Sequence, residues 1–250
     1  MRYSEFSLLI STIAGRIQGV DKLIKSLNNN DIKIIIVIQQ YKKLNHFEKC
    51  IINKFNLDKN ITIILTETTG VTKSRNIALK NLQTKFALFS DDDVVYNKNS
   101  LEIIKNSFDR YNHIGFLTFS IQDEYGNLLK NYPNKTKKHT KLSILKVGTI
   151  EIAINRELCA NFFFPEDMGA GQYLFCCDEP VFLGQILNSK ISGLHIPEVI
   201  CTHPKISSGK GLKSKNALLS RYHCFNRIFG KIIGNFVFLL FLIKNFRKVI

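Results

Sequence analysis

Three consecutive aspartates, Asp91 to Asp93, follow the short apolar run "KFALF" at residues 85–89. Neighbouring carboxylates repel one another, so all three stay ionised at low cost only where a positive group binds beside them. A divalent cation, which prefers hard carboxylate oxygens, is one such group. An exposed turn in which water solvates the acids is the other explanation. The triplet by itself leaves both explanations open.

The triplet follows the last of four apolar runs that are typical of buried strands. Segments with helical character separate the runs, and this alternation indicates parallel βαβ units with both faces of the sheet covered. Ligands of such sheets bind at the carboxyl ends of the strands. Thr12, Gln39 and Gly70 are expected at that edge together with the aspartates. The predicted strands are Phe6–Thr12, Ile32–Gln40, Ile61–Glu67 and Lys85–Phe89, and the predicted helices cover 20–29, 46–55 and the residues after Gly70.

The pattern changes after Ser100. We expect a helix over 100–111, a strand over 114–122 and a hairpin turn at Gly126, where "DEYGN" has turn composition. Further along the chain, the sequence predicts a strand within 147–157, a helix over 178–190, an extended segment over 193–204 and a loop over 205–215.

Composition limits the protein's class. The chain has 250 residues, of which 45% are hydrophobic and 22% charged, as in an ordinary globular α/β domain. The net charge of +15 favours anionic partners, although a general abundance of lysine explains part of it. The six cysteines include no CxxC pair, and the N-terminus has only a short apolar core of about seven residues. We therefore expect a reduced, cytoplasmic protein.

Four short motifs occur in a fixed order: the strands themselves, the run Gly70-x-x-x-x-Arg75-Asn76, the aspartate triplet and "FCCDEPVFLGQIL" at 175–187. Together they resemble family 2 glycosyltransferases of GT-A fold over roughly 7–211. The resemblance implies an α/β fold, with a Rossmann-like, mixed and mainly parallel sheet flanked by helices. The predicted glycosyltransferase domain covers 1–215, and a basic, apolar helical segment covers 216–250.

The triplet matches the DxD motif of that family. The resemblance implies that Asp91 and Asp92 help to bind the nucleotide sugar, and that Asp93, Asp91 and His203 bind Mn2+ or Mg2+ beside the diphosphate. A cation suits this reaction because charge develops on the departing nucleoside diphosphate. A lone histidine such as His203 is equally compatible with an ordinary packed residue.

The remaining residues of the nucleotide-sugar site follow from the same resemblance. Arg75 and Asn76 match the start of the helix after the third strand, where fixed donors suit phosphate or base groups. The alternative is a solvated first helical turn. Gln39 stands where many relatives carry acids, which leaves the nucleotide preference open. The predicted nucleotide-sugar contacts are Thr12, Gln39, Gly70, Arg75, Asn76, Asp91 and Asp92.

Asp178 and Glu179 match the acidic pair that opens the helix of the acceptor half. Inverting transfer needs one base to accept the proton of the attacking hydroxyl. In the family the second acid usually has that role, so the resemblance implies Glu179 as the base and Asp178 as the reserve. The order is reversed here, since Glu-Asp is commoner. A helix N-terminus that merely favours acids is the alternative explanation.

The chain ends in an apolar core of about a dozen residues, Ile232 to Ile243, between lysines. This is shorter than the ~20 apolar residues that cross a bilayer. A basic, aromatic-rich segment is able to lie in a membrane interface, and a terminal helix packed on the domain is the alternative.

The sequence thus predicts an inverting transferase that moves a sugar from a nucleotide donor, with UDP-sugars favoured, to a saccharide or lipid-linked acceptor in cell-surface polysaccharide synthesis. The expected location is the cytoplasm, with peripheral association at an anionic membrane surface. A metal-dependent nucleotidyltransferase and a basic nucleic-acid-binding protein are the alternatives. The second leaves both acidic groups unexplained, so we expect no nucleic-acid partner.

Overall fold

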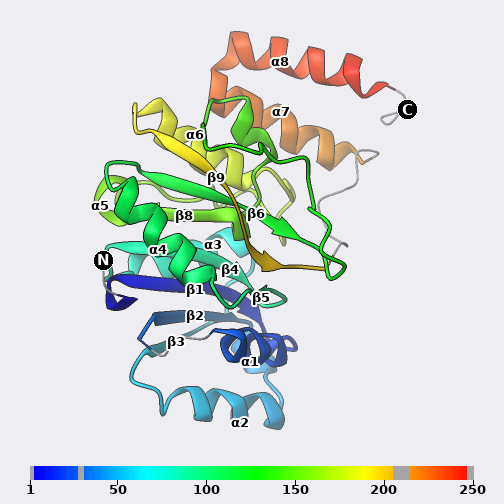
Figure 1. The fold of residues 1–250 in the computed structure, drawn as a ribbon. Helices are drawn as coiled ribbons and strands as arrows, with labels where there is room; N and C mark the ends of the chain where they lie inside the picture. Colours follow the sequence, from blue (N-terminus) through cyan, green and yellow to red (C-terminus); the bar gives the residue numbers. More distant parts are fainter. Residues whose placement is uncertain (1–2, 28–30, 205–213, 247–250) are drawn as a thin grey trace.

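The computed structural model describes residues 3–27, 31–204 and 214–246. Within these residues the chain forms one nine-stranded sheet in the order β3-β2-β1-β4-β8-β6-β9-β5, with β7 paired to β9 (Figure 1). The strands are β1 (Phe6–Ile13), β2 (Lys33–Gln39), β3 (Ile61–Thr66), β4 (Phe86–Asp91), β5 (Val95–Tyr96), β6 (Phe116–Gln122), β7 (Lys137–Lys138), β8 (Ile152–Asn155) and β9 (Gly193–Thr202).

The first four strands confirm the predicted parallel units. β3, β2, β1 and β4 are mutually parallel neighbours, while β8 inserts antiparallel to both β4 and β6 and makes the sheet mixed. The predicted mixed, mainly parallel α/β fold is therefore confirmed. The helices are α1 (Ile17–Ser26), α2 (His46–Phe55), α3 (Val71–Lys80), α4 (Ser100–Arg110), α5 (Arg156–Cys159), α6 (Asp178–Asn188), α7 (Lys215–Phe229) and α8 (Lys231–Lys244).

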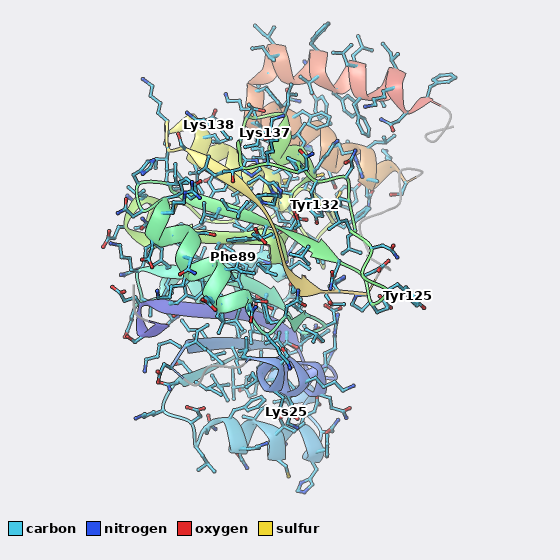
Figure 2. All side chains as sticks on the ribbon, viewed as in Figure 1. Lys25, Phe89, Tyr125, Tyr132, Lys137 and Lys138 are labelled. Atoms are coloured by element: carbon cyan, nitrogen blue, oxygen red, sulfur yellow. The ribbon has the colours of Figure 1, made fainter. Side chains whose placement is uncertain are left out.

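The sheet has a helical layer on each face. Because successive strand residues point to opposite faces, Leu8 and Ile10 of β1 face α1, α2 and α4, whereas Leu9 faces α3, α6 and α7. Phe89 of β4, labelled in Figure 2, is fully buried with its ring at 5.9 Å from that of Phe182 on α6. Burying such a side chain stabilises the fold by about 1.5–3 kcal/mol. The core thus fixes α6 against the strand that ends in the aspartates.

The strand register aligns the carboxyl ends of the parallel strands. Ile13 of β1 pairs with Gln39 of β2, Gln39 pairs with Thr66 of β3, and Ser11 pairs with Asp91 of β4. The expected common edge is therefore formed, and the polar residues that follow these strands lie at the same edge of the sheet.

Two predicted elements differ from the structure. The strand expected within 147–157 is shorter, because a 3-10 turn at Thr149–Glu151 precedes β8. The turn at Gly126 is present with a φ of +81°, a conformation that glycine tolerates, but its return arm pairs with β6 only through the bridge of Gln122 to Leu128. The side chain of Asp123 caps the turn by accepting from the backbone N–H of Asn127 at 2.8 Å.

The C-terminal segment folds as two helices, α7 and α8, with Gly230 between them at a φ of +80°. α7 packs on α6, where Ile228 contacts Gly184, and α8 packs on α7 at the top of the molecule in Figure 1. None of the helices among the described residues combines the length and apolar character that crossing a membrane requires. The predicted division between domains at residue 215 stays a prediction, and the loop predicted over 205–215 falls largely outside the described residues.

Candidate active site

The three aspartates occupy different environments at the end of β4. Asp92 is buried, whereas the side chains of Asp91 and Asp93 retain 34% and 38% of their exposure. The triplet is therefore not a uniformly solvated turn. One carboxylate points into the protein, and two line its surface.

Asp92 connects β4 to the end of β1. Its Oδ2 accepts a hydrogen bond of 2.6 Å from the hydroxyl of Thr12, and its Oδ1 pairs with the guanidinium of Arg16. Burial raises the pKa of Asp92 to about 6, although Thr12 and Arg16 both favour the ionised form. Thr12 and Asp92, both predicted to contact the nucleotide sugar, are thus brought together.

Asp93 lies between the side chains of Arg16 and His203. Arg16 donates to its Oδ2 at 2.9 Å, and Nε2 of His203 lies 3.1 Å from its Oδ1. The pKa of Asp93 is lowered, chiefly by His203 and also by Arg16, although desolvation opposes this shift. The contact with Asp93 in turn raises the pKa of His203. The structure therefore brings together two of the three predicted metal ligands, from β4 and from the residue that follows β9.

Arg75 joins the triplet to the second acidic group. Its side chain on α3 is only 6% exposed and donates to Asp178 at 2.7 Å; it also lies 3.4 Å from Asp91 and 3.7 Å from Glu179. Burial alone lowers the pKa of Arg75, but the three carboxylates outweigh it and the pKa is raised. The guanidinium also lies over the ring of Phe164, at 5.4 Å from its centroid. A permanently charged group thus stands between Asp91 of the triplet and the Asp178–Glu179 pair.

Asp178 and Glu179 occupy the first turn of α6, where the helix dipole favours negative charge. Cys177 precedes them with a φ of +70°, and its side chain does not cap the helix. Burial raises the pKa of Asp178 to about 8, and the charge of Glu179 adds to that effect while Arg75 opposes it. Glu179 is more accessible, at 19% side-chain exposure, and accepts from the hydroxyl of Thr149 at 2.6 Å. The pair is therefore asymmetric: one acid is buried with a raised pKa, and the other lies at the site surface.

Two further predicted residues, Gln39 and Gly70, hold the wall of the site. The amide of Gln39 donates to the Thr68 hydroxyl and to the carbonyl of Gly70, both at 3.0 Å. Gly70 precedes α3 with a φ of +100°, and a Cβ there would lie 2.2 Å from the amide nitrogen of Gln172. Only glycine fits this position without a shift of Gln172.

The amide of Asn76 contacts the segment that carries Phe164 and Glu166. Its Nδ2 donates to the Phe164 carbonyl at 2.9 Å and to Glu166 at 3.0 Å, and its Oδ1 accepts from the Phe164 backbone at 2.8 Å. In the structure this amide positions the segment that carries Phe164, the ring beneath Arg75. A direct contact between Asn76 and the nucleotide stays a prediction.

Two site residues were missed by sequence reasoning. Arg16, in the loop after β1, pairs with Asp92 and Asp93, and Thr149, in the turn before β8, binds Glu179. The glycine-flanked "AGRIQG" was a local signal for Arg16, because it follows a strand end and carries a cation. For Thr149 the sequence holds no such signal, since its partner is 30 positions away.

Asp93 and His203 present facing donor atoms at the end of β4. The part of the chain that the structure describes contains no group of three or more His, Cys, Asp or Glu side chains placed to hold a metal. However, the buried Oδ1 of Asp93 accepts no well-formed hydrogen bond from any described residue, and it faces Nε2 of His203. A carboxylate oxygen and an imidazole nitrogen suit Mn2+ or Mg2+ when phosphate oxygens and water supply the other ligands. The residues present therefore fit a cation that binds together with a diphosphate.

Comparisons with solved structures show the same fold. The chain matches Staphylococcus aureus TarS residues 1–349 with a TM-score of 0.70 and 17% identity, covering 97% of this chain and 72% of that one. The same TarS fragment in complex with UDP-GlcNAc matches with a TM-score of 0.67 and 16% identity, covering 98% of this chain and 73% of that one. The chain spans 44% of the longer TarS structure.

The mannosyltransferase PcManGT of Pyrobaculum calidifontis, solved with GDP-Man and Mn2+, matches with a TM-score of 0.63 and 14% identity, covering 89% of this chain and 63% of that one. No curated protein sequence matches the chain significantly. The family model described as glycosyl transferase family 2 matches residues 9–162, which include most of β1, all of β2 to β4, the aspartate triplet and Arg75. The chain belongs to glycosyl transferase family 2 and has the GT-A fold.

Proposed function

We propose that the protein is an inverting glycosyltransferase that uses a nucleoside-diphosphate sugar as donor. The observation that carries this proposal is Arg75, which contacts Asp91 of the triplet on one side and the Asp178–Glu179 pair on the other. Arg75 thereby links the carboxylates of the proposed donor site to those of the proposed base site. A transferase needs this proximity, because the acceptor must attack the carbon that the diphosphate leaves.

The donor occupies the common edge of β1, β2, β3 and β4. The proposed contacts with the nucleotide and its sugar are Thr12, Gln39, Gly70, Arg75, Asn76, Asp91 and Asp92. A UDP-sugar is the favoured donor, in line with the TarS structures that contain UDP or UDP-GlcNAc. The PcManGT structure contains GDP-Man, and the amide of Gln39 is able both to donate to and to accept from a nucleotide base.

Asp93, Asp91 and His203 are the proposed ligands of Mn2+ or Mg2+ in the donor complex. When bound, such a cation stabilises the negative charge that develops on the diphosphate. Arg16 supports a negatively charged ligand here, because its side chain is 52% exposed beside Asp93. Its guanidinium is available to phosphate oxygens.

Glu179 is the proposed base. It is the more accessible acid of the pair, and the hydroxyl of Thr149 holds one of its oxygens, which leaves the other to accept the proton of an acceptor hydroxyl. Asp178, whose pKa is about 8, retains a proton at neutral pH and is the weaker candidate. Arg75, which remains charged at every physiological pH, lies 3.7 Å from Glu179 and orients the pair.

The acceptor is a saccharide, free or lipid-linked, and the reaction contributes to cell-surface polysaccharide synthesis. The enzyme acts in the cytoplasm and associates peripherally with the inner face of the cell membrane. These finer statements follow from the family resemblance and the basic C-terminal segment.

The proposal is tested by incubating the protein with a panel of nucleotide sugars and measuring donor hydrolysis with and without Mn2+. In parallel, thermal shifts are compared for UDP with Mn2+, other nucleotides and single-stranded DNA. We expect hydrolysis of one UDP-sugar and a shift with UDP plus Mn2+ that EDTA removes and that Asp93→Ala abolishes. Pyrophosphate release from a nucleoside triphosphate would indicate a nucleotidyltransferase instead, and a shift with DNA alone would indicate a nucleic-acid-binding protein.

A further inference from the structure

Helix α8 has two apolar faces, and only one of them packs on the protein. On the packed face Val237, Phe238 and Phe241 contact α7, where the ring centroids of Phe238 and Phe241 lie 6.3 and 5.7 Å from that of Phe225. Gly234 allows the two helices to cross closely, because a Cβ there would come within 2.6 Å of the Cα of Asn226. This face accounts for the attachment of α8 to the domain.

The opposite face is apolar and exposed. Its residues recur at spacings of three, four and seven, which places them on one side of a helix. Figure 2 shows the side chains of α8 projecting from the end of the molecule. A contiguous exposed apolar surface of this kind marks an interaction site rather than a packing feature. The docking face comprises Ile232 (88% exposed), Ile233 (57%), Phe236 (60%), Leu239 (53%), Leu240 (49%) and Ile243 (64%), and Phe246 just beyond the helix is 63% exposed.

The charged residues of the C-terminal segment are all of one sign. After Glu198 the sequence contains no Asp or Glu, yet it contains 10 of the 35 Lys and Arg residues. Ten of the fifteen net positive charges therefore belong to the last 52 residues. Lys231 and Lys244, both exposed, stand at the two ends of α8. The apolar face is thus bordered by cations and by no acid of its own segment.

This charge distribution separates the two candidate occupants. A second copy of the chain on the docking face would bring two acid-free, positively charged segments together, and like charges oppose that contact. An anionic lipid surface offers the complementary charge together with acyl chains for the apolar side chains. The 14 residues of α8 span about 21 Å as a helix, short of the ~30 Å hydrocarbon core, so the helix lies along a bilayer and does not cross it.

We propose that the docking face of α8 binds the interface of an anionic membrane, with Lys231 and Lys244 at the level of the headgroups. α7 packs on both α8 and α6, and so it connects the membrane-binding helix α8 to the helix that carries Asp178 and Glu179. One part of this proposal rests on the proposed function: a membrane-bound enzyme would reach a lipid-linked acceptor from this surface. Membrane binding itself needs neither donor nor acceptor.

The first test is vesicle co-sedimentation of the full chain without nucleotide. Vesicles of phosphatidylcholine alone are compared with vesicles that also contain phosphatidylglycerol. Replacing four exposed residues of the docking face by Gln should weaken binding to the anionic vesicles at least about tenfold, since each replacement removes a side chain that enters the interface. The replaced residues are Ile232, Phe236, Leu239 and Ile243.

The matched control carries the same number of Gln substitutions at exposed apolar residues on other elements, and it should bind like the wild type. These residues are Phe47 (57% exposed), Leu57 (87%), Leu128 (51%) and Leu142 (62%). Equal binding of all three proteins would overturn the proposal. Circular dichroism verifies that both variants fold, and folding is expected because every replaced side chain is exposed.

A second variant tests the charges independently. Lys231→Gln with Lys244→Gln should reduce the preference for anionic over neutral vesicles several-fold, and high salt should do the same for the wild type. Lys59→Gln with Lys98→Gln, at exposed lysines elsewhere, is the control. If neither the substitution of Lys231 and Lys244 nor high salt changed the preference for anionic vesicles, anionic lipid would not be the occupant of the docking face.

Analytical ultracentrifugation of the same proteins excludes the other occupant. A wild-type dimer that the docking-face substitutions disperse would identify a second copy on this surface and overturn the membrane proposal. A monomer in both cases supports it. Loss of vesicle binding with intact donor hydrolysis would separate this inference from the proposed function, as would the reverse result.

Discussion

The two acidic groups of the site are neutralised in opposite ways. The aspartate triplet meets Arg16, whose side chain is 52% exposed, and His203, which follows β9. The Asp178–Glu179 pair meets Arg75, which is 6% exposed and held over Phe164. Exposed ion pairs contribute about 0–1 kcal/mol and exchange partners readily. Removing a buried charged donor costs about 1.5–3 kcal/mol, because its hydrogen-bond partner is left in the interior without it.

This difference matches the two proposed roles. A group that receives a cation and a diphosphate must release its resting partners, whereas a base must keep its geometry throughout turnover. We therefore expect the exposed Arg16 to leave the triplet when the donor binds, and the buried Arg75 to stay in contact with the Asp178–Glu179 pair.

Removing the base should have the largest effect. Glu179→Gln keeps the shape of the side chain and loses the proton acceptor, so turnover should fall by about 10²–10⁴-fold while nucleotide binding survives. Asp178→Asn should slow turnover less, because the pKa of Asp178 already holds its proton at neutral pH. Steady-state kinetics with an identified donor measure both variants.

A greater loss in Asp178→Asn would transfer the role of base to Asp178. If neither substitution slowed transfer, the pair would be no more than a helix N-terminus that favours acids.

Removing the permanent cation should be the next largest change. Arg75→Met removes the buried donor to Asp178 and the cation beside Asp91 and Glu179, so the free energy of unfolding should fall by about 1.5–3 kcal/mol. The control is Arg227→Met, which breaks the partly exposed pair with Asp167 and should cost about 1 kcal/mol or less. Urea unfolding measures both. Equal losses of unfolding free energy in the two variants would show that the buried contacts of Arg75 are no stronger than the partly exposed pair of Arg227 with Asp167.

The pH dependence of stability tests the buried acid itself. The pKa of Asp178 is raised from 3.8 to about 8, so between these values the folded protein binds a proton that the unfolded chain has released. Stability therefore falls as pH rises through this window, by at most about 1.4 kcal/mol per pH unit and by about 2.3 kcal/mol in all between pH 6 and 8.

Asp178→Asn lacks this titration. Urea unfolding at pH 6 and pH 8 should show a steeper decline for the wild type than for the variant. Parallel declines in the two proteins would show that Asp178 is ionised throughout.

The smallest effect is expected for the exchangeable cation. Arg16→Ala removes a competitor from Asp93, so the affinity for Mn2+ without nucleotide should rise by about two- to fivefold, in keeping with an exposed ion pair. Calorimetric titration measures this change, and Lys22→Ala, at an exposed lysine on α1, is the control. Weaker Mn2+ binding in Arg16→Ala than in the control would mean that Arg16 supports the cation site and does not compete for it.

Much of the fold was accessible from the sequence because its signals are local. Continuous apolar runs specify the four parallel strands, and the turn residue Gly70 marks the start of α3. The position of the triplet at a strand end needed only the length of the run before it. The C-terminal apolar core likewise specified helix, but Gly230, which divides it from α7, was not recognised as a break.

The sequence by itself therefore determined that acids stand at the carboxyl edge of a mainly parallel sheet and that a second acidic pair opens a later helix. Only the tertiary structure decided which cation neutralises each acid. Arg75 and Asp178 are 103 positions apart, and His203 reaches Asp93 only because β9 pairs with β5, the strand that follows the triplet. Burial and pairing depend on which elements pack together, and an ion pair acquires its strength from that packing and not from the residue types alone.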